Sequence, residues 1–242
     1  MEKVVILHKF TTADTMKIGI IVAMEKEFVE LRTLLDNASA ERHNNKDFII
    51  GNIENNLIIM QQCGIGKVNS AIGAVELINN YHPDIIISTG VAGGADVTLN
   101  VTDVVVGTSY VYHDAHCGSE CAPGQIMGMP EKFNAPKQLV DIATSIEGET
   151  NIKPGLIVSG EWFVDSREKM QSILDVFPEA VAVDMESCSI AQTCHIYGVP
   201  FISFRIISDI PLKDNNASQY FDFWARMAEG SFNVTKKFLA SL

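Results

Sequence analysis

Residues 183 to 209 read VDMESCSIAQTCHIYGVPFISFRIISD, and this stretch decides the fold class of the chain. It begins at the end of an apolar run, AVAVDM, continues through a helix-like segment, SCSIAQTCHIYG, and closes with a second apolar run, PFISFRIISD. Strand, helix and strand in this order are typical of an open α/β sheet, where ligands bind beyond the carboxyl ends of the strands. Glu186 and Asp209 stand at those ends, so they are candidates for chemistry. A first-turn helix acid and a turn residue would also suit these two positions.

The same alternation begins near the start of the chain. MKIGIIVAM, from Met16, is typical of a buried parallel strand, and residues 25 to 35 predict a helix with Glu27 in its first turn. One face of that helix is apolar and consists of Phe28, Leu31, Leu34 and Leu35. An Asn- and Glu-rich stretch follows to about Lys46, and FIIGNIENNLIIMQQC then predicts two strands joined by a polar turn.

GIGKVNSAIGAVELI, from Gly64, predicts a tight turn that leads into a helix. It lacks the four-residue spacer and the Lys-Ser/Thr ending of a Walker motif, so we do not expect it to bind a nucleoside triphosphate. The apolar spacing predicts a buried helix face made of Val68, Ala71, Ile72, Val75 and Ile78.

The run DIIIST predicts another buried strand, followed by GVAGG at residues 90 to 94. Glycines after a strand let a ligand approach the backbone closely, so a ligand contact and a simple turn are both open here. A long strand begins at Asp103 and leads into His113, His116, Cys117 and Cys121, which invite a zinc interpretation. Their spacing matches no standard closed site, and we expect no metal.

A glycine- and proline-rich loop runs to Pro130 and is long enough to form a lid or a subunit contact. A helix over residues 137 to 146 and the strand GLIVSG follow, and then the pair Trp162-Phe163. These two aromatic rings would suit either the core or stacking on a flat base. His195 lies near a helix end, as a solvated or capping residue would. The last helix is expected from about Tyr220 to Leu239.

Composition limits the class of function. The 242 residues are 47% hydrophobic, which is typical of a globular protein, and 30 acidic against 18 basic residues give a net charge of -12 that disfavours nucleic-acid binding. No apolar run approaches the length of a spanning helix, and the first 15 residues lack a secretory cleavage site. Five cysteines without framework spacing fit reduced thiols. We therefore expect a cytoplasmic α/β/α protein with no membrane partner, consisting of an N-terminal extension (1–15) and a single domain (16–242).

Six motifs together resemble the 5'-methylthioadenosine/S-adenosylhomocysteine nucleosidases. They are MKIGIIVAMEKE, GIGKVNSA, STGVAGG, SGEWFV, AVDMES and RIISD, and they occur in the family's order over the chain from Met16 to Leu242. The resemblance implies the nucleoside phosphorylase fold, a three-layer α/β/α sandwich around a central mixed twisted sheet. It also implies a homodimer that acts on small-molecule 5'-thioadenosine nucleosides in methionine salvage, with no cofactor and no metal.

The resemblance also implies a role for each of three carboxylates. Glu27 matches the base that activates water, Asp209 the acid that protonates the purine, and Glu186 the group that holds the ribose hydroxyls. Cleavage of a purine N-riboside builds positive charge on the sugar and negative charge on the base, so the chemistry asks for acids in these three tasks. A free aspartic acid is protonated only about once in 10³ at pH 7, so Asp209 needs burial to raise its pKa.

Further positions match the family's substrate contacts. Met185 would pack beside the sugar, Phe163 would stack on adenine, Val164 would read the base edge through its backbone, and Gly93 would contribute a backbone position. Ser208 and Arg205 would support the Asp209 loop. The candidates for the apolar pocket around the alkylthio group are Met24, Ile65 and Phe221, for which ordinary core packing is an equal alternative.

Two rival functions remain at this point. A purine nucleoside phosphorylase of the same fold would need arginine donors for phosphate, whereas the turn after the first strand offers Glu27. A non-catalytic nucleoside-binding protein would not need a base directed at water. The chain also departs from the family at three places: Val91 replaces a common hydroxyl residue, Asp184 replaces a glutamate, and residues 211 to 221 form a slightly longer segment.

Overall fold

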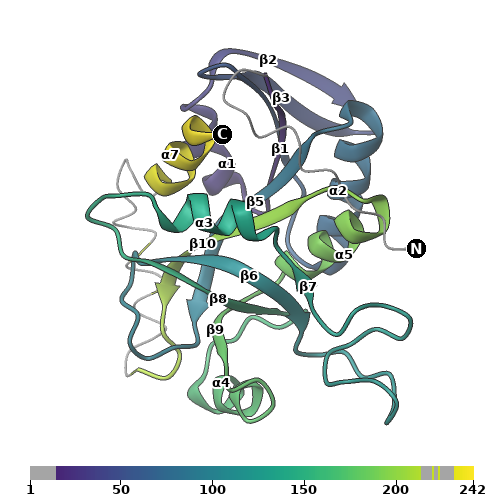
Figure 1. Ribbon diagram of the computed structural model, residues 1–242, viewed down its shortest axis with the longest axis vertical. Helices are drawn as coiled ribbons and strands as arrows, with labels where there is room; N and C mark the ends of the chain where they lie inside the picture. Colours follow the sequence, from purple (N-terminus) through teal and green to yellow (C-terminus); the bar gives the residue numbers. More distant parts are fainter. Residues whose placement is uncertain (1–14, 214–219, 221–222, 224–231) are drawn as a thin grey trace.

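The computed structural model describes residues 15–213, 220, 223 and 232–242, and it has the alternating order of strands and helices that the sequence predicts (Figure 1). The elements are β1 (Lys17–Val22), α1 (Glu25–Arg32), β2 (Asp36–His43), β3 (Lys46–Ile53), β4 (Asn56–Gln62), α2 (Lys67–Tyr81), β5 (Ile85–Gly94), β6 (Val104–Tyr112), β7 (Phe133–Asn134), α3 (Lys137–Thr144), β8 (Ile152–Ser159), α4 (Arg167–Leu174), β9 (Ala180–Asp184), α5 (Ser187–Tyr197), β10 (Phe201–Asp209) and α7 (Asn233–Ser241).

The strands of the described residues form one mixed sheet in the order β10-β6-β8-β9-β5-β1-β4-β3-β2. β1 pairs in parallel with both β4 and β5, and β10 pairs in parallel with β5. β10 also pairs with β6, β6 with β8, β8 with β9, and β9 with β5. Hydrogen-bonded pairing therefore links five strands, β5, β10, β6, β8 and β9, in a closed circuit. The carboxyl ends of β1, β5, β9 and β10 supply the residues of the site described below.

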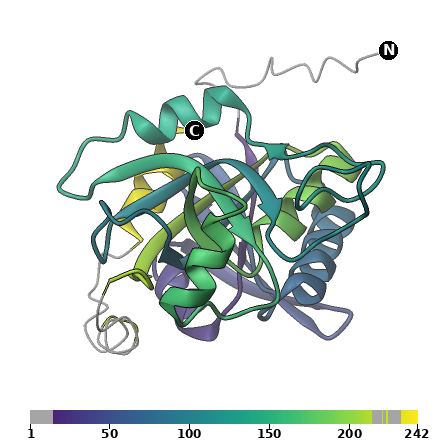
Figure 2. The same cartoon turned by 90° about the horizontal axis from the view of Figure 1, so that it is seen from below.

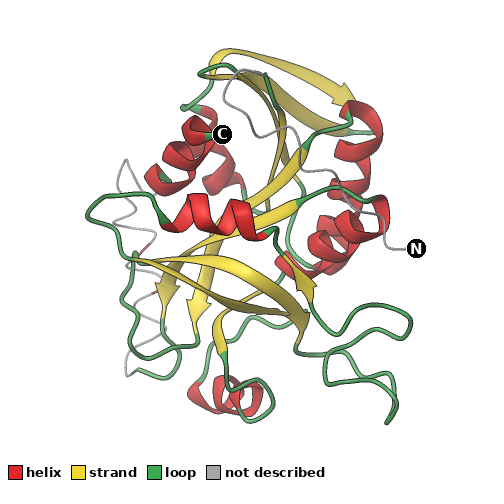
Figure 3. Ribbon diagram, in the orientation of Figure 1, coloured by secondary structure: helices red, strands yellow, loops and turns green. Residues whose placement is uncertain are grey.

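Helices cover both faces of this sheet (Figures 1 and 3). Alternate side chains of the strands enter two separate cores, as expected for strands with both faces covered. In one core, Leu31 near the end of α1, Leu139 of α3 and Phe238 of α7 pack on the sheet. In the other core, α2 and α5 pack on the sheet (Figure 2). A third, smaller core lies under α4. The predicted three-layer α/β/α sandwich around a mixed sheet is confirmed.

The predicted buried face of α2 is wrong. Val68 and Ile72 are exposed, Ala71 and Val75 are partly exposed, and of the predicted set Ile78 alone is buried. The helix buries a different face, which consists of Ser70, Gly73, Ala74, Leu77 and Ile78. Burial of Ser70 is tolerated because its hydroxyl lies 2.6 Å from the hydroxyl of Ser189 on α5, so the polar group has a partner.

Two other segments differ from the sequence-based expectation. The polar stretch before Lys46 contains a strand, β2, whose residues are all exposed and which is held by pairing with β3. The glycine-rich segment GVAGG is not a turn after a strand, because β5 continues through Gly94 and pairs there with β9.

The predicted N-terminal extension falls almost entirely on residues 1–14, which lie outside the described residues, and the boundary at residue 16 stays a prediction. The final helix is described as α7, and most of the segment from Tyr220 to residue 231 lies outside the described part. Within the described ranges, no helix is long and apolar enough to cross a membrane.

Candidate active site

Glu27 is held at the carboxyl end of β1 by the first turn of α1. Its Oε2 accepts hydrogen bonds from the backbone N–H groups of Met24 (2.9 Å) and Ala23 (3.2 Å), so the carboxylate caps its own helix. Its Oε1 accepts a hydrogen bond from Val91 of β5 at 3.0 Å. Burial raises the pKa of Glu27, although the backbone donors and the positive charge of Arg205 oppose this. The result is a fixed carboxylate whose proton affinity is higher than that of a free glutamate.

Gly90 makes this placement possible. A Cβ atom at Gly90 would lie 2.6 Å from Oε1 of Glu27 and 3.0 Å from Nη1 of Arg205. Both distances are too short for a side chain, so glycine is needed where β5 passes between these two groups. The GVAGG segment therefore brings bare backbone next to two charged side chains.

Glu186 lies in the turn between β9 and α5, with 7% of its surface exposed. Its Oε1 accepts a hydrogen bond from the backbone N–H of Gly66 at 2.9 Å. Burial, followed by the negative charge of Asp184, raises the pKa of Glu186 to about 7, while Arg205 and the Gly66 amide act in the opposite direction. Small changes in charge around Glu186 therefore shift its ionisation near neutral pH.

Asp184 and Arg205 form a buried ion pair beneath this carboxylate. Nε of Arg205 donates to Oδ2 of Asp184 at 2.6 Å, and Nη2 donates to the hydroxyl of Ser88 at 2.9 Å. Asp184 also accepts hydrogen bonds from Ser159 Oγ and from Ser187 at the start of α5. Asp184 therefore fixes both the guanidinium and the first turn of the helix that follows Glu186.

Asp209 is the last residue of β10 and follows an irregularity in the strand. The pairing of β10 with β5 shifts between Ile207 and Asp209, and consecutive residues Ser208 and Asp209 both line the same pocket. In a regular strand two consecutive side chains point to opposite faces, so the bulge is what brings them together. Ser208 Oγ lies 2.7 Å from Oδ1 of Asp209. Burial raises the pKa of Asp209 to about 6, partly offset by this hydrogen bond.

Two neighbouring aromatic residues follow β8. Trp162 and Phe163 are 51% and 52% exposed, so neither is a core residue, although both line the pocket. The ring of Phe163 meets that of Tyr220 edge-on at 5.2 Å. The next residue, Val164, is buried. The loop thus places one exposed aromatic face beside the carboxylates.

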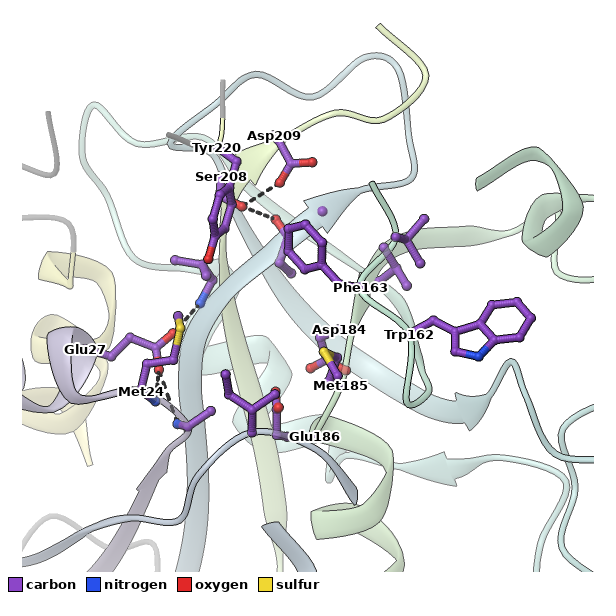
Figure 4. A pocket seen from close by; sticks show the side chains of 17 residues that line it. Met24, Glu27, Trp162, Phe163, Asp184, Met185, Glu186, Ser208, Asp209 and Tyr220 are labelled. Atoms are coloured by element: carbon purple, nitrogen blue, oxygen red, sulfur yellow. Dashed lines mark hydrogen bonds between the residues drawn. The ribbon is translucent and has the colours of Figure 1, made fainter. Parts of the chain in front are cut away.

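One cleft collects these groups. Figure 4 shows Glu27, Glu186 and Asp209 on different sides of it, with the Phe163 ring across from Glu27. The site residues predicted from the sequence that line the cleft are Met24, Glu27, Ile65, Gly93, Phe163, Val164, Met185, Glu186, Ser208 and Asp209. The remaining candidate, Phe221, lies outside the described residues.

The structure corrects one predicted contact and adds others. Arg205 does not brace the Asp209 loop through any of its hydrogen bonds in the described chain, because those bonds go to Asp184 and Ser88. Trp162, for which the sequence left core packing and stacking open, lines the cleft, as do Asp184 and Tyr220, which sequence reasoning did not select as site residues. For Asp184 the signal was present, since an acid stands one position before Met185 in the motif, but its buried partner is remote in sequence.

The described residues contain no group of three or more His, Cys, Asp or Glu side chains arranged to hold a metal ion. The zinc interpretation of the His113 region therefore gains no support. Instead, the ring of His113 packs against Gly160 and Trp162, and burial lowers its pKa.

The chemistry open to the cleft follows from its charges. Three carboxylates surround one space, and burial raises the pKa of each. A site of this kind can accept a proton at one group and donate a proton from another near neutral pH. The half-exposed ring of Phe163 offers a stacking surface for a planar group between them.

Comparisons with known proteins find relatives over almost the whole chain. The family model described as the phosphorylase superfamily matches residues 17–240. A 5'-methylthioadenosine/S-adenosylhomocysteine nucleosidase from Desulfotalea psychrophila is 38% identical over 232 residues, which cover 94% of this chain and 98% of the relative. The enzyme of that name from Staphylococcus carnosus is 40% identical over 231 residues, covering 93% of this chain and 100% of the relative.

The fold is also found among solved structures. The crystal structure of S-adenosylhomocysteine nucleosidase from Streptococcus pyogenes, in complex with 5-methylthiotubericidin, superposes with a TM-score of 0.89 at 33% identity. The match covers 96% of this chain and 99% of that one. The likeness therefore extends over the whole described fold and includes the elements that build the cleft.

Proposed function

Since the chain belongs to the phosphorylase superfamily and, within it, to the 5'-methylthioadenosine/S-adenosylhomocysteine nucleosidases, we propose that it hydrolyses the N-glycosidic bond of these two nucleosides. The products are adenine and the corresponding 5'-thioribose. The observation that carries the proposal is the gathering of three buried carboxylates and one exposed aromatic ring in a single cleft.

In this proposal Glu27 removes a proton from water on the face of the sugar opposite the departing base. Its orientation is set by three backbone N–H donors, which hold both oxygens before substrate arrives. The raised pKa of Glu27 favours this role, because a base is most effective when its pKa lies close to the working pH.

Glu186 stabilises the cationic ribose and holds its hydroxyls. Its Oε1 is engaged by Gly66, and we assign Oε2 to the sugar. As the C1'–N9 bond breaks, its electron pair moves into the purine, and Asp209 delivers its proton to N7. A pKa of about 6 leaves a useful fraction of Asp209 protonated near neutral pH. Ser208 donates its hydroxyl to Oδ1 of Asp209, and the same hydroxyl lies 3.3 Å from the carbonyl oxygen of Ala92.

Water is favoured over phosphate by the charge of the site. A phosphate oxygen placed about 4 Å from Glu27 would cost roughly 4 kcal/mol at an effective dielectric constant near 20. Arg205 does not cancel this cost, because the ion pair with Asp184 and the nearby Glu186 already use its positive charge. These charges support hydrolysis rather than phosphorolysis.

We also propose that the chain acts as a homodimer in the cytoplasm, in the salvage of methionine. Three apolar side chains are exposed here, Ile65 at the cleft and Val68 and Ile72 on α2, and a second copy would cover them. All five cysteines are free thiols, which fits a reducing compartment.

The test is adenine release by the purified chain in phosphate-free buffer, with 5'-methylthioadenosine and S-adenosylhomocysteine as substrates. We expect turnover of both nucleosides by the wild type and a loss of about 10² to 10⁴ in kcat for Glu27→Gln. Binding of adenine without release from either nucleoside would instead indicate a nucleoside-binding protein.

A further inference from the structure

A closed ring of interactions joins the loop that carries Phe163 to the start of α2. The backbone N–H of Lys67 donates to Oε1 of Glu161 at 2.7 Å. The backbone N–H of Glu161 donates to Oδ2 of Asp114 at 2.9 Å. The ring closes where Nζ of Lys67 reaches both carboxylate oxygens of Asp114 at 2.9 Å. The mechanism described above uses none of these three residues.

The ring lies where it can set the geometry of the cleft. Glu161 immediately precedes Trp162 and Phe163, and Lys67 immediately follows Gly66, whose N–H holds Glu186. The backbone N–H groups of Gly66 and Lys67 thus bind two different sides of the cleft. One holds the sugar-side carboxylate, and the other holds the aromatic loop.

The close fit at this point supports the same interpretation. Gly66 has a φ of +94°, and a Cβ atom there would lie 2.7 Å from Oε2 of Glu161. The carboxylate of Glu161 therefore packs directly on the turn that carries the Glu186 contact. The Asp114 side chain is 13% exposed, and Lys67 and the Glu161 amide hold its pKa below the usual range, against the effect of burial. Its charge is thus present over the whole working pH range.

Phe163 needs such an anchor because it is half-exposed and its own packing fixes it only partly. On the C-terminal side, the buried Val164 holds the loop in the third core. On the N-terminal side, the interactions among Lys67, Glu161 and Asp114 hold the loop through Glu161. Without that second anchor, the Phe163 backbone could move relative to Glu186.

We propose that Glu161, held by Lys67 and Asp114, is a positioning residue that fixes the aromatic loop relative to Glu186, so that one helix start aligns the base and sugar halves of the substrate. The inference rests on the proposed function, since it takes Phe163 as the ring that stacks on adenine. The interactions among Lys67, Glu161 and Asp114 affect binding of the base and leave the proton-transfer groups unchanged.

The experiment compares Glu161→Ala, Glu161→Gln and Asp114→Ala with the wild type. We expect Glu161→Ala to raise KM for 5'-methylthioadenosine roughly tenfold, the effect of losing about one charge-assisted hydrogen bond, with kcat within about threefold. Glutamine keeps an acceptor for the Lys67 N–H, so Glu161→Gln restores KM. We expect Asp114→Ala to raise KM as Glu161→Ala does. The double variant should raise KM little further, because both substitutions break the same set of interactions. Glu168→Ala, an exposed acid in the first turn of α4, serves as the control.

Adenine affinity, measured by calorimetry, separates this inference from the proposed function. A wild type that binds adenine but releases none from the nucleosides would contradict the function, while weaker adenine binding by Glu161→Ala would still support the positioning role. Unchanged KM and unchanged adenine affinity in Glu161→Ala would overturn the inference. So would a loss of kcat that follows the melting temperature at constant KM, because that pattern indicates a purely structural role.

Discussion

Asp184 and Arg205 form an ion pair at 2.6 Å beneath the cleft, with side chains that are 1% and 3% exposed. The pair joins the end of β9 to the middle of β10 and places the guanidinium near Glu27 and Glu186. A positive charge is thereby kept among the carboxylates of Asp184, Glu186 and Glu27. The same pairing reduces its capacity to bind a phosphate.

Breaking this pair should destabilise the fold strongly. Asp184→Asn leaves a buried guanidinium without its counter-charge, and we expect a loss of about 3 kcal/mol or more in the free energy of unfolding. Urea unfolding followed by circular dichroism measures it. The matched control is Asp47→Asn in the exposed pair with Arg42, where we expect less than about 1 kcal/mol. Equal losses in the two variants would contradict the importance of the buried pair.

Removing the leaving-group acid should abolish most of the turnover. We expect Asp209→Asn to lower kcat by about 10² to 10⁴, because asparagine cannot deliver a proton to N7. Initial rates of adenine release measure the effect, and Asp175→Asn at the exposed end of α4 is the control. If Asp209→Asn keeps its turnover within a few-fold, the acid lies elsewhere.

The pH dependence should follow the protonation of Asp209. Since the acid must enter protonated, kcat/KM should fall as the pH rises above about 6. The hydrogen bond from Ser208 favours the carboxylate and lowers its pKa, so Ser208→Ala should raise that pKa and move the descending limb to higher pH. A profile from pH 4 to 9 for both proteins checks the sign, and a shift toward lower pH would argue against this assignment.

The exposed face of α2 should control assembly. Val68 is 69% and Ile72 is 47% exposed, and a charge at either position would oppose burial against a second copy. We expect the wild type to have the mass of a dimer in light scattering and Val68→Glu/Ile72→Glu to have that of a monomer. The control is Val176→Glu, which alters an exposed apolar residue after α4. A monomeric wild type would refute the dimer.

Much of the site could be predicted from the sequence because its acids stand at strand ends. The position of an acid at the end of an apolar run, as for Glu186 and Asp209, or in the first turn of the helix that follows one, as for Glu27, is a local feature that can be predicted without knowledge of its neighbours. The motifs supplied further cleft residues, including Phe163. Their roles in catalysis and binding stay predictions.

The features that could not be predicted correctly from the sequence depend on contacts between distant segments. α2 carries apolar residues on its exposed face, Val68 and Ile72, as well as on its buried face, and the buried Ser70 finds its partner in Ser189, 119 residues away. The exposed strand β2 has no hydrophobic alternation and forms by pairing its backbone with β3. The partner of Arg205 could not be identified from local sequence for the same reason, since Asp184 lies on another strand.

The most direct test of the central claim is the identity of the sugar product. Purified protein is incubated with 5'-methylthioadenosine, with and without inorganic phosphate, and the sugar is identified by mass spectrometry. We predict free methylthioribose in both samples and equal rates of adenine release, because Glu27 activates water. A methylthioribose phosphate formed only when phosphate is present would contradict hydrolysis and would establish phosphorolysis in its place.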